Sequence, residues 1–381
     1  MVSFGKSFFQ VFALGLLLAA LCALPSCQDE ELVAGEAFNN DREIDKINKL
    51  TAIAKEAEAL WPGYTVPQTH PLLLIFQDED GEGTIGYLLN ITEVPEGSEK
   101  MDSAPVRGIT VYRNDLLAQE ARTHFGGSLP PFAFDLELKG IIFFMVSEII
   151  PPPSPYFAFK AVGGNDLALL VTHELFHQFQ FDKPWTLNGF RQDFLGYPQT
   201  ADMIALSLLL SDQLSDAYQG GSPESFLEKY VAIRQRQLAI DPSTQKLVRH
   251  QALFTESIEG SARYVEHFSA LATSYPTISN DPTHGYQAQL DTVKYSATLA
   301  RHILVQRIPY HVGAAIIHLL DGLNVDVVGS LPRGETPYSL ARAYLKKDDA
   351  YFDGVLAALL ASVNWSSYQA RAQELEALLK R

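Results

Sequence analysis

The chain is poor in cysteine and in basic residues. Among its 381 residues are 2 Cys, and 29 Lys and Arg stand against 45 Asp and Glu, for a net charge of −16. This balance supplies no basic footprint for nucleic acid and disfavours docking on an anionic membrane surface by charge. A hydrophobic content of 47% excludes an intrinsically disordered chain. We therefore expect a globular protein with a sizeable core and no nucleic-acid partner.

The N-terminus predicts export. The apolar run over 11–24 is short for a bilayer span but fits the core of a signal peptide over 1–26. The run ends in LPSC, which resembles a bacterial lipobox with Cys27 as the lipidated residue; a weaker alternative ends at Cys22. The acidic residues after Cys27 resemble the surface-export signal of Bacteroidetes-type lipoproteins. We predict an outer-membrane lipoprotein that faces the periplasm or the cell surface, held by lipid alone, with a polar tether over 27–43.

The rest of the chain predicts an α+β fold with two lobes. The small N-terminal lobe, 44–165, combines a helix with a mostly antiparallel sheet, and the larger C-terminal lobe, 166–381, is helical. In the first lobe, helical periodicity at 44–60 precedes short β-type runs at 71–76, 85–90, 108–112 and within 132–150. In the second, helical segments lie near 200–219, 223–240, 246–272, 285–305, 310–322, 338–361 and 364–380.

One pentapeptide, HELFH at 173–177, points to chemistry. It lies in a stretch with apolar residues on nearly every side, so we expect a buried helix. Burying two imidazoles and a carboxylate without partners is unfavourable, and a metal ion would compensate for it. His173 and His177 are one helical turn apart and can bind one cation together. Glu174 stands next to the first ligand, where it can accept a proton from water.

A zinc site needs a third protein ligand. The best candidate is Glu259, within the helical pattern TESIEGSARYVEHF, where small residues next to Glu259 would allow close packing on the HELFH helix. Glu256 and Glu266 are rival carboxylates, and His267 is a weaker candidate. A solvent-exposed role, the usual one for an acidic residue on a helix, fits Glu266 better than Glu259.

At this point the sequence resembles the gluzincin zinc peptidases, especially the aminopeptidase N type. Their third ligand is the Glu of an N-E-G-x-A-x-Y motif, and here Glu259 is followed by Gly260, Ala262 and Tyr264 at the matching positions. Downstream, the sequence PYHVG at 309–313 resembles the P-Y-x-x-G segment of the same family.

The resemblance implies a zincin-like fold and a set of roles. Zn²⁺ would be held by His173, His177 and Glu259, and Glu174 would be the general base. Tyr310 would donate to the oxyanion of the tetrahedral intermediate, with His311 as a candidate helper.

The sequence also departs from that family. Ile258 replaces the Asn of the motif, and Glu259 follows His177 by 82 residues (259 − 177), a much longer spacing. The insert over 178–258 predicts two or three helices. The G-x-M-E-N motif that binds the substrate's free amine is absent, so aminopeptidase activity does not transfer.

The sequence therefore predicts a zinc metallohydrolase, and a peptidase acting on a peptide or protein substrate above other hydrolases. The alternative is a non-enzymatic surface lipoprotein that binds a protein or glycan on a degenerate zincin scaffold. Substrate identity, endo- or exo-action and oligomeric state stay open.

Overall fold

The computed structural model describes residues 40–77, 83–101, 109–149, 167–183, 185–186, 190–191, 193–218, 221–273 and 296–380. The predicted signal peptide, Cys27 and most of the predicted tether lie outside the described residues. So do the proline-rich segment 151–155 and most of the helix expected at 285–305.

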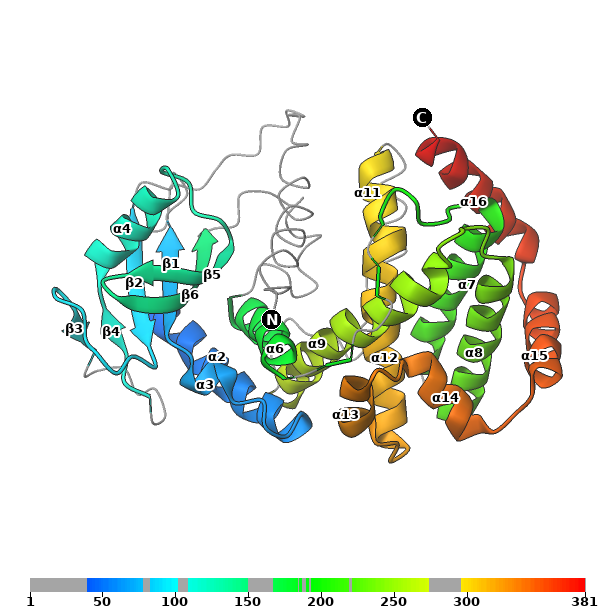
Figure 1. Ribbon diagram of the computed structural model, residues 1–381, viewed down its shortest axis with the longest axis horizontal. Coiled ribbons are helices and arrows are strands. Elements are labelled where there is room, and N and C mark those ends of the chain that lie inside the picture. The colour runs from blue at the N-terminus through cyan, green and yellow to red at the C-terminus, as the bar shows by residue number, and fades with distance from the viewer. Residues whose placement is uncertain are drawn as a thin grey trace. The chain divides into compact units, whose positions relative to one another are not determined.

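Six strands form one mixed sheet in the order β3-β4-β2-β1-β6-β5 (Figure 1). They are β1 (Leu72–Gln77), β2 (Thr84–Leu89), β3 (Glu99–Lys100), β4 (Tyr112–Arg113), β5 (Phe132–Leu138) and β6 (Ile141–Ile149). The pairing of β1 with β6 is parallel, with Leu72 opposite Phe144, and the other pairings are antiparallel. Together with the helices, this sheet confirms the predicted α+β class.

The predicted helical segments are helical where the structure describes them, and three further helices, at 66–69, 115–124 and 327–330, were not predicted. In the described residues they are α2 (Asn40–Leu60), α3 (Val66–Thr69), α4 (Asp115–His124), α6 (Leu167–Asp182), α7 (Ala201–Tyr218), α8 (Pro223–Ile240), α9 (Leu253–Ala272), α11 (Ala297–His302), α12 (Ile308–Gly322), α13 (Val327–Ser330), α14 (Pro337–Leu345), α15 (Asp349–Ser362) and α16 (Trp365–Leu379). A short 3₁₀ turn, η3 (Leu331–Arg333), follows α13. The helix expected at 44–60 begins four residues earlier, within the expected tether. Helices α7 and α8 fill the predicted insert.

The sheet is covered by helices on both faces. Residues 72–77 of β1 are all buried, which is typical of a strand enclosed from two sides. On one face, Leu73 and Ile75 join a cluster with Leu117 of α4. On the other face, Leu72, Leu74 and Phe76 join the main core, which continues through α2 and α6 into the C-terminal helices. The HELFH helix α6 is thus anchored in the main core.

Two π-turns precede regular helices. The turn η1 (Val248–Ala252) leads directly into α9, and η2 (Ile303–Arg307) joins α11 to α12. The sequence predicted one helix ending at 305 and another beginning at 310. In the structure the chain is instead continuously helical from Ala297 to Gly322. Within the described residues this is the one helix long and apolar enough to cross a membrane, but 72% of its apolar window is buried, as in a core helix.

The helix expected over 338–361 is two helices. Lys346 ends α14 in the left-handed region, with φ 54°. Asp348 then caps α15 by accepting a hydrogen bond from the backbone N–H of Tyr351 at 2.9 Å. Helical periodicity alone did not reveal this break, because the apolar spacing continues on both sides of it.

Candidate metal centre

The two histidines of HELFH lie one turn apart on α6. His173 and His177 are 9% and 7% exposed, and their Nε2 atoms are 3.1 Å apart. Aromatic packing holds the helix here: Trp61 and Tyr64 meet the Phe176 ring edge-on at 5.1 and 5.0 Å. The sequence expectation of a buried helix with both imidazoles on one side is confirmed.

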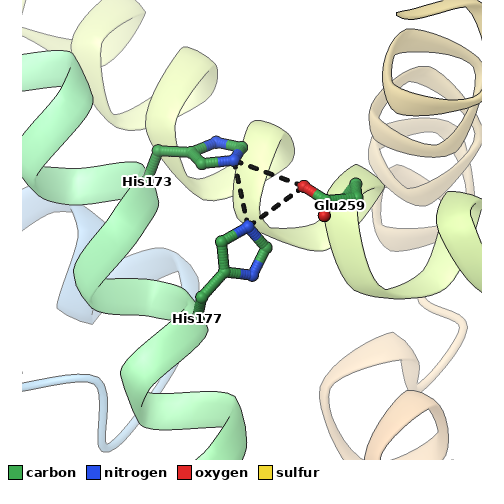
Figure 2. A group of neighbouring side chains, drawn as sticks. All are labelled: His173, His177 and Glu259. Atoms are coloured by element: carbon green, nitrogen blue, oxygen red, sulfur yellow. Dashed lines mark hydrogen bonds and ion pairs between the residues drawn. The ribbon is translucent and has the colours of Figure 1, made fainter. Parts of the chain in front are cut away.

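Glu259 brings the third ligand atom from α9. Its Oε2 lies 3.0 Å from His177 Nε2 and 3.5 Å from His173 Nε2, and the side chain is 2% exposed. Figure 2 shows the three side chains converging from the two helices. The other carboxylate oxygen, Oε1, is buried and has no hydrogen-bond partner among the described residues.

The outer nitrogen of each imidazole has its own acceptor. His173 Nδ1 lies 2.9 Å from Glu266 Oε2. His177 Nδ1 lies 2.7 Å from Gln180 Oε1, while the amide nitrogen of Gln180 donates to Ile258 O and Ser261 Oγ, both at 2.9 Å. Both Nδ1 atoms are therefore donors, which leaves each Nε2 with a lone pair directed at the centre.

Two imidazole lone pairs and a carboxylate oxygen thus converge, and a proton or a metal ion between them would offset their mutual repulsion. Without a metal, protons bound to the histidines must balance the negative charge of Glu259. Burial lowers the pKa of His173, but its hydrogen bonds with Glu259 and Glu266 outweigh burial and raise it to about 10. Burial likewise opposes the effect of Glu259 on His177, whose pKa is raised. Burial works against ionised Glu259 too, but the two histidines hold the pKa of its carboxyl well below the usual range.

The spacing of the three atoms fits a metal ion. Ligands at about 2.0–2.2 Å from a tetrahedral metal lie about 3.3–3.6 Å from one another. The observed separations of 3.0–3.5 Å are close to this range. The His173–His177–Glu259 group can therefore hold a metal ion.

The rival ligands have other roles. Glu256 accepts hydrogen bonds from Tyr230 and Arg234 in a fully buried ion pair. Glu266 is 4% exposed and contacts the outer side of His173, so the expectation of a solvent-exposed Glu266 was wrong. The reason is that α9 is buried on nearly all sides. His267 is also buried but is not part of the group.

Glu174 is near the group without belonging to it. Its pKa is raised by burial, and the nearby histidines counteract this effect. No hydrogen bond joins its carboxylate to another described residue. Within the described part of the chain, hydrogen bonds therefore do not tie this carboxylate to the fold.

Tyr310 lies beside the first histidine. Its ring stacks on His173 with centroids 5.9 Å apart and planes 5° from parallel. Burial, and next the charge of Glu259, raise its pKa well above the ordinary value. Tyr264, from the motif of Glu259, instead donates to Asp321 Oδ2 at 2.9 Å. His311, the next residue on α12, is also buried.

Helices α9 and α12 cross at two glycines, Gly260 and Gly313, which allow their backbones to approach closely; we call this contact the glycine crossing. A Cβ atom added to Gly260 would lie 2.6 Å from Gly313 Cα, and one added to Gly313 would lie 2.3 Å from Glu256 O. The backbones of the two helices therefore touch. Gly260 was expected to pack on the HELFH helix; it faces α12 instead, and Ser261 is the residue that contacts α6 through Gln180.

Sequence reasoning missed three supporting residues: Glu266 as a partner of His173, Gln180, and Arg263, which donates to Glu266 Oε1. A signal existed for two of them. Residues 259 and 266 are seven apart and so lie within about 20° on a helix, and Gln180 is one turn from His177.

Comparison of the chain with protein-family models, with curated proteins and with solved structures gives no match.

Proposed function

We propose that this chain is a zinc-dependent hydrolase with a zincin-like scaffold that cleaves peptide bonds. The observation that carries the proposal is the convergence of His173, His177 and Glu259 from two helices, with each imidazole turned by an outer partner so that its lone pair faces the centre.

Zinc is the metal that this ligand set favours. Two imidazole nitrogens and one carboxylate oxygen are typical zinc ligands, and three protein ligands leave a fourth position open, as in catalytic rather than structural sites. When bound, zinc acts as a Lewis acid and lets water become a nucleophile near neutral pH.

The chain's own residues supply the remaining steps. Glu174 accepts the proton of the attacking water and later delivers it to the leaving amine. Burial favours this role because it raises the pKa of Glu174 towards the working pH. Tyr310 donates its hydroxyl proton to the developing oxyanion, and its stacking on His173 supports this placement.

Cellular location is part of the proposal. We infer from the LPSC segment that Cys27 carries the lipid and that the enzyme acts on peptides or proteins at the outer membrane. A metal-free surface protein that binds protein or glycan is the competing function, and the metal content separates the two.

The decisive experiment measures metal first and activity second. Purified protein should contain about one zinc per chain, lost in His173→Ala, His177→Ala and Glu259→Ala. Glu256→Gln, one turn away on the same helix, is the matched control and should keep the metal. Zinc retained in Glu259→Ala would contradict the ligand set.

The activity test uses Glu174→Gln on a library of quenched fluorescent peptides. This variant should keep zinc and fold but lose nearly all hydrolysis, because a neutral amide cannot accept the proton. Cleavage at the rate of the unmodified protein would exclude Glu174 as the base.

A further inference from the structure

Two buried arginines contact carboxylates of α9, and their hydrogen bonds differ. Arg234 is 1% exposed; its Nε and Nη2 donate to Glu256 and its Nη1 donates to Gln237. All three nitrogens of this guanidinium have acceptors, as expected of an ion pair that serves the fold.

Arg263 has one such contact among the described residues. It is 3% exposed, and its Nη1 donates to Glu266 Oε1, while Nε and Nη2 are buried without a hydrogen-bond partner among the described residues. Buried, unpaired donors are unfavourable, so this arginine is poorly explained as a stabilising ion pair.

Through its contact with Glu266, Arg263 is linked to the His173–His177–Glu259 group. Arg263 binds one oxygen of Glu266, and the other oxygen of Glu266 lies 2.9 Å from His173 Nδ1. Arg263 thereby fixes the rotation of the carboxylate about its side chain. A carboxylate fixed in this way keeps the proton of His173 on Nδ1 and the lone pair of Nε2 towards the centre.

We propose that Arg263 is a positioning residue of the metal centre, which acts through Glu266 to hold His173 in its ligand orientation. The inference rests on the metal site of the proposed function, but it does not depend on hydrolysis.

The sign of the effect separates this role from a simple charge effect. A positive charge near a metal site weakens cation binding by repulsion, so loss of the charge alone would tighten zinc binding. Loss of a positioning contact weakens it, by about 10–100-fold for partners in the second layer of a metal site.

The experiment measures the dissociation constant of Zn²⁺ for the purified full chain, by competition with a chromophoric chelator. Arg263→Met should bind zinc about 10–100-fold more weakly, and Arg263→Lys should lie between it and the unmodified protein. Arg234→Lys is the matched control and should leave zinc affinity unchanged. The absorption bands of bound Co²⁺ should shift in Arg263→Met and not in Arg234→Lys, because they report ligand geometry.

A double-variant cycle tests the route through Glu266. In a Glu266→Gln background, Arg263→Met should have little further effect on zinc affinity, because the contact that it removes is already lost. Equal or tighter zinc binding in Arg263→Met, or full additivity in the cycle, would overturn the inference alone. Absence of zinc binding in the unmodified protein would overturn the proposed function and this inference with it.

Discussion

Glu256 and Glu259 lie one turn apart on α9, both fully buried, yet their surroundings differ in kind. Glu256 accepts hydrogen bonds from Tyr230 at 2.6 Å and from Arg234 at 2.8 Å. Glu259 faces two histidine nitrogens, and its second oxygen has no hydrogen-bond partner among the described residues. The first carboxylate has a permanent cation within the fold. The second can be balanced only by protons or by a metal ion.

The largest loss of stability should come from breaking the ion pair between Arg234 and Glu256. Glu256→Gln leaves Arg234 buried without a counter-charge, and we expect a loss of about 3–5 kcal/mol in the free energy of unfolding. Glu259→Gln should cost the metal-free protein less, because histidines can release a proton and arginine cannot. Urea unfolding of both metal-free variants measures the difference. Equal losses would show that the two carboxylates serve the fold alike.

In the presence of zinc, the gain in stability should depend on Glu259 and not on Glu256. At a concentration of about 1,000 times its dissociation constant, zinc should raise the free energy of unfolding by about 4.1 kcal/mol. This gain should persist in Glu256→Gln and disappear in Glu259→Gln. Thermal or urea unfolding with zinc and with chelator provides the comparison. A gain that survives in Glu259→Gln would place the metal elsewhere.

The tyrosines beside the two carboxylates give the third test. Tyr310→Phe should lower the turnover number by roughly 10²–10³-fold, about 2.7–4 kcal/mol in the barrier, with KM and zinc content nearly unchanged. Tyr230→Phe should instead lower stability by about 1.5–3 kcal/mol and leave turnover intact. Should Tyr310→Phe be silent while Tyr264→Phe or His311→Ala is inactive, the oxyanion donor lies elsewhere.

The smallest effect concerns the glycine crossing. Gly313→Ala places a methyl group against the backbone of Glu256, and we expect a loss of about 1–3 kcal/mol from overpacking. Gly354→Ala is the control, because a Cβ atom there meets nothing within 4 Å in the middle of α15. It should gain up to about 1 kcal/mol from helix propensity. Stability measured by urea unfolding checks both, and equal effects would remove the argument for a close crossing.

The sequence was most informative for the two histidines, because both lie on the same helix. The spacing of His173 and His177 places both imidazoles on one side of α6 whatever surrounds it. The choice among Glu256, Glu259 and Glu266 was harder, since all three lie on one helix within eleven residues. Only the crossing of α9 with α6 decides which oxygen meets the Nε2 atoms.

The sheet and the outer partners depend on contacts between distant segments. The short runs predicted strands, but the parallel pairing of β1 with β6 joins residues about 70 apart, and no local pattern specifies it. Arg263 was unremarkable in the sequence, because a charged residue on a helix is usually exposed. The proposed positioning role of Arg263 depends on the burial of Glu266, and helical spacing alone does not predict that burial.

The helices that carry Glu259 and Tyr310 each begin directly after a π-turn, η1 and η2. A π-turn holds one residue more than an α-turn, so the side chains that follow are rotated by about 100° relative to an uninterrupted helix. Deleting one residue from η2, which joins α11 to α12, would restore regular helix but rotate Tyr310 away from His173. Substitutions at this turn are therefore easier to accommodate than insertions or deletions, and chain length is the more restricted property here.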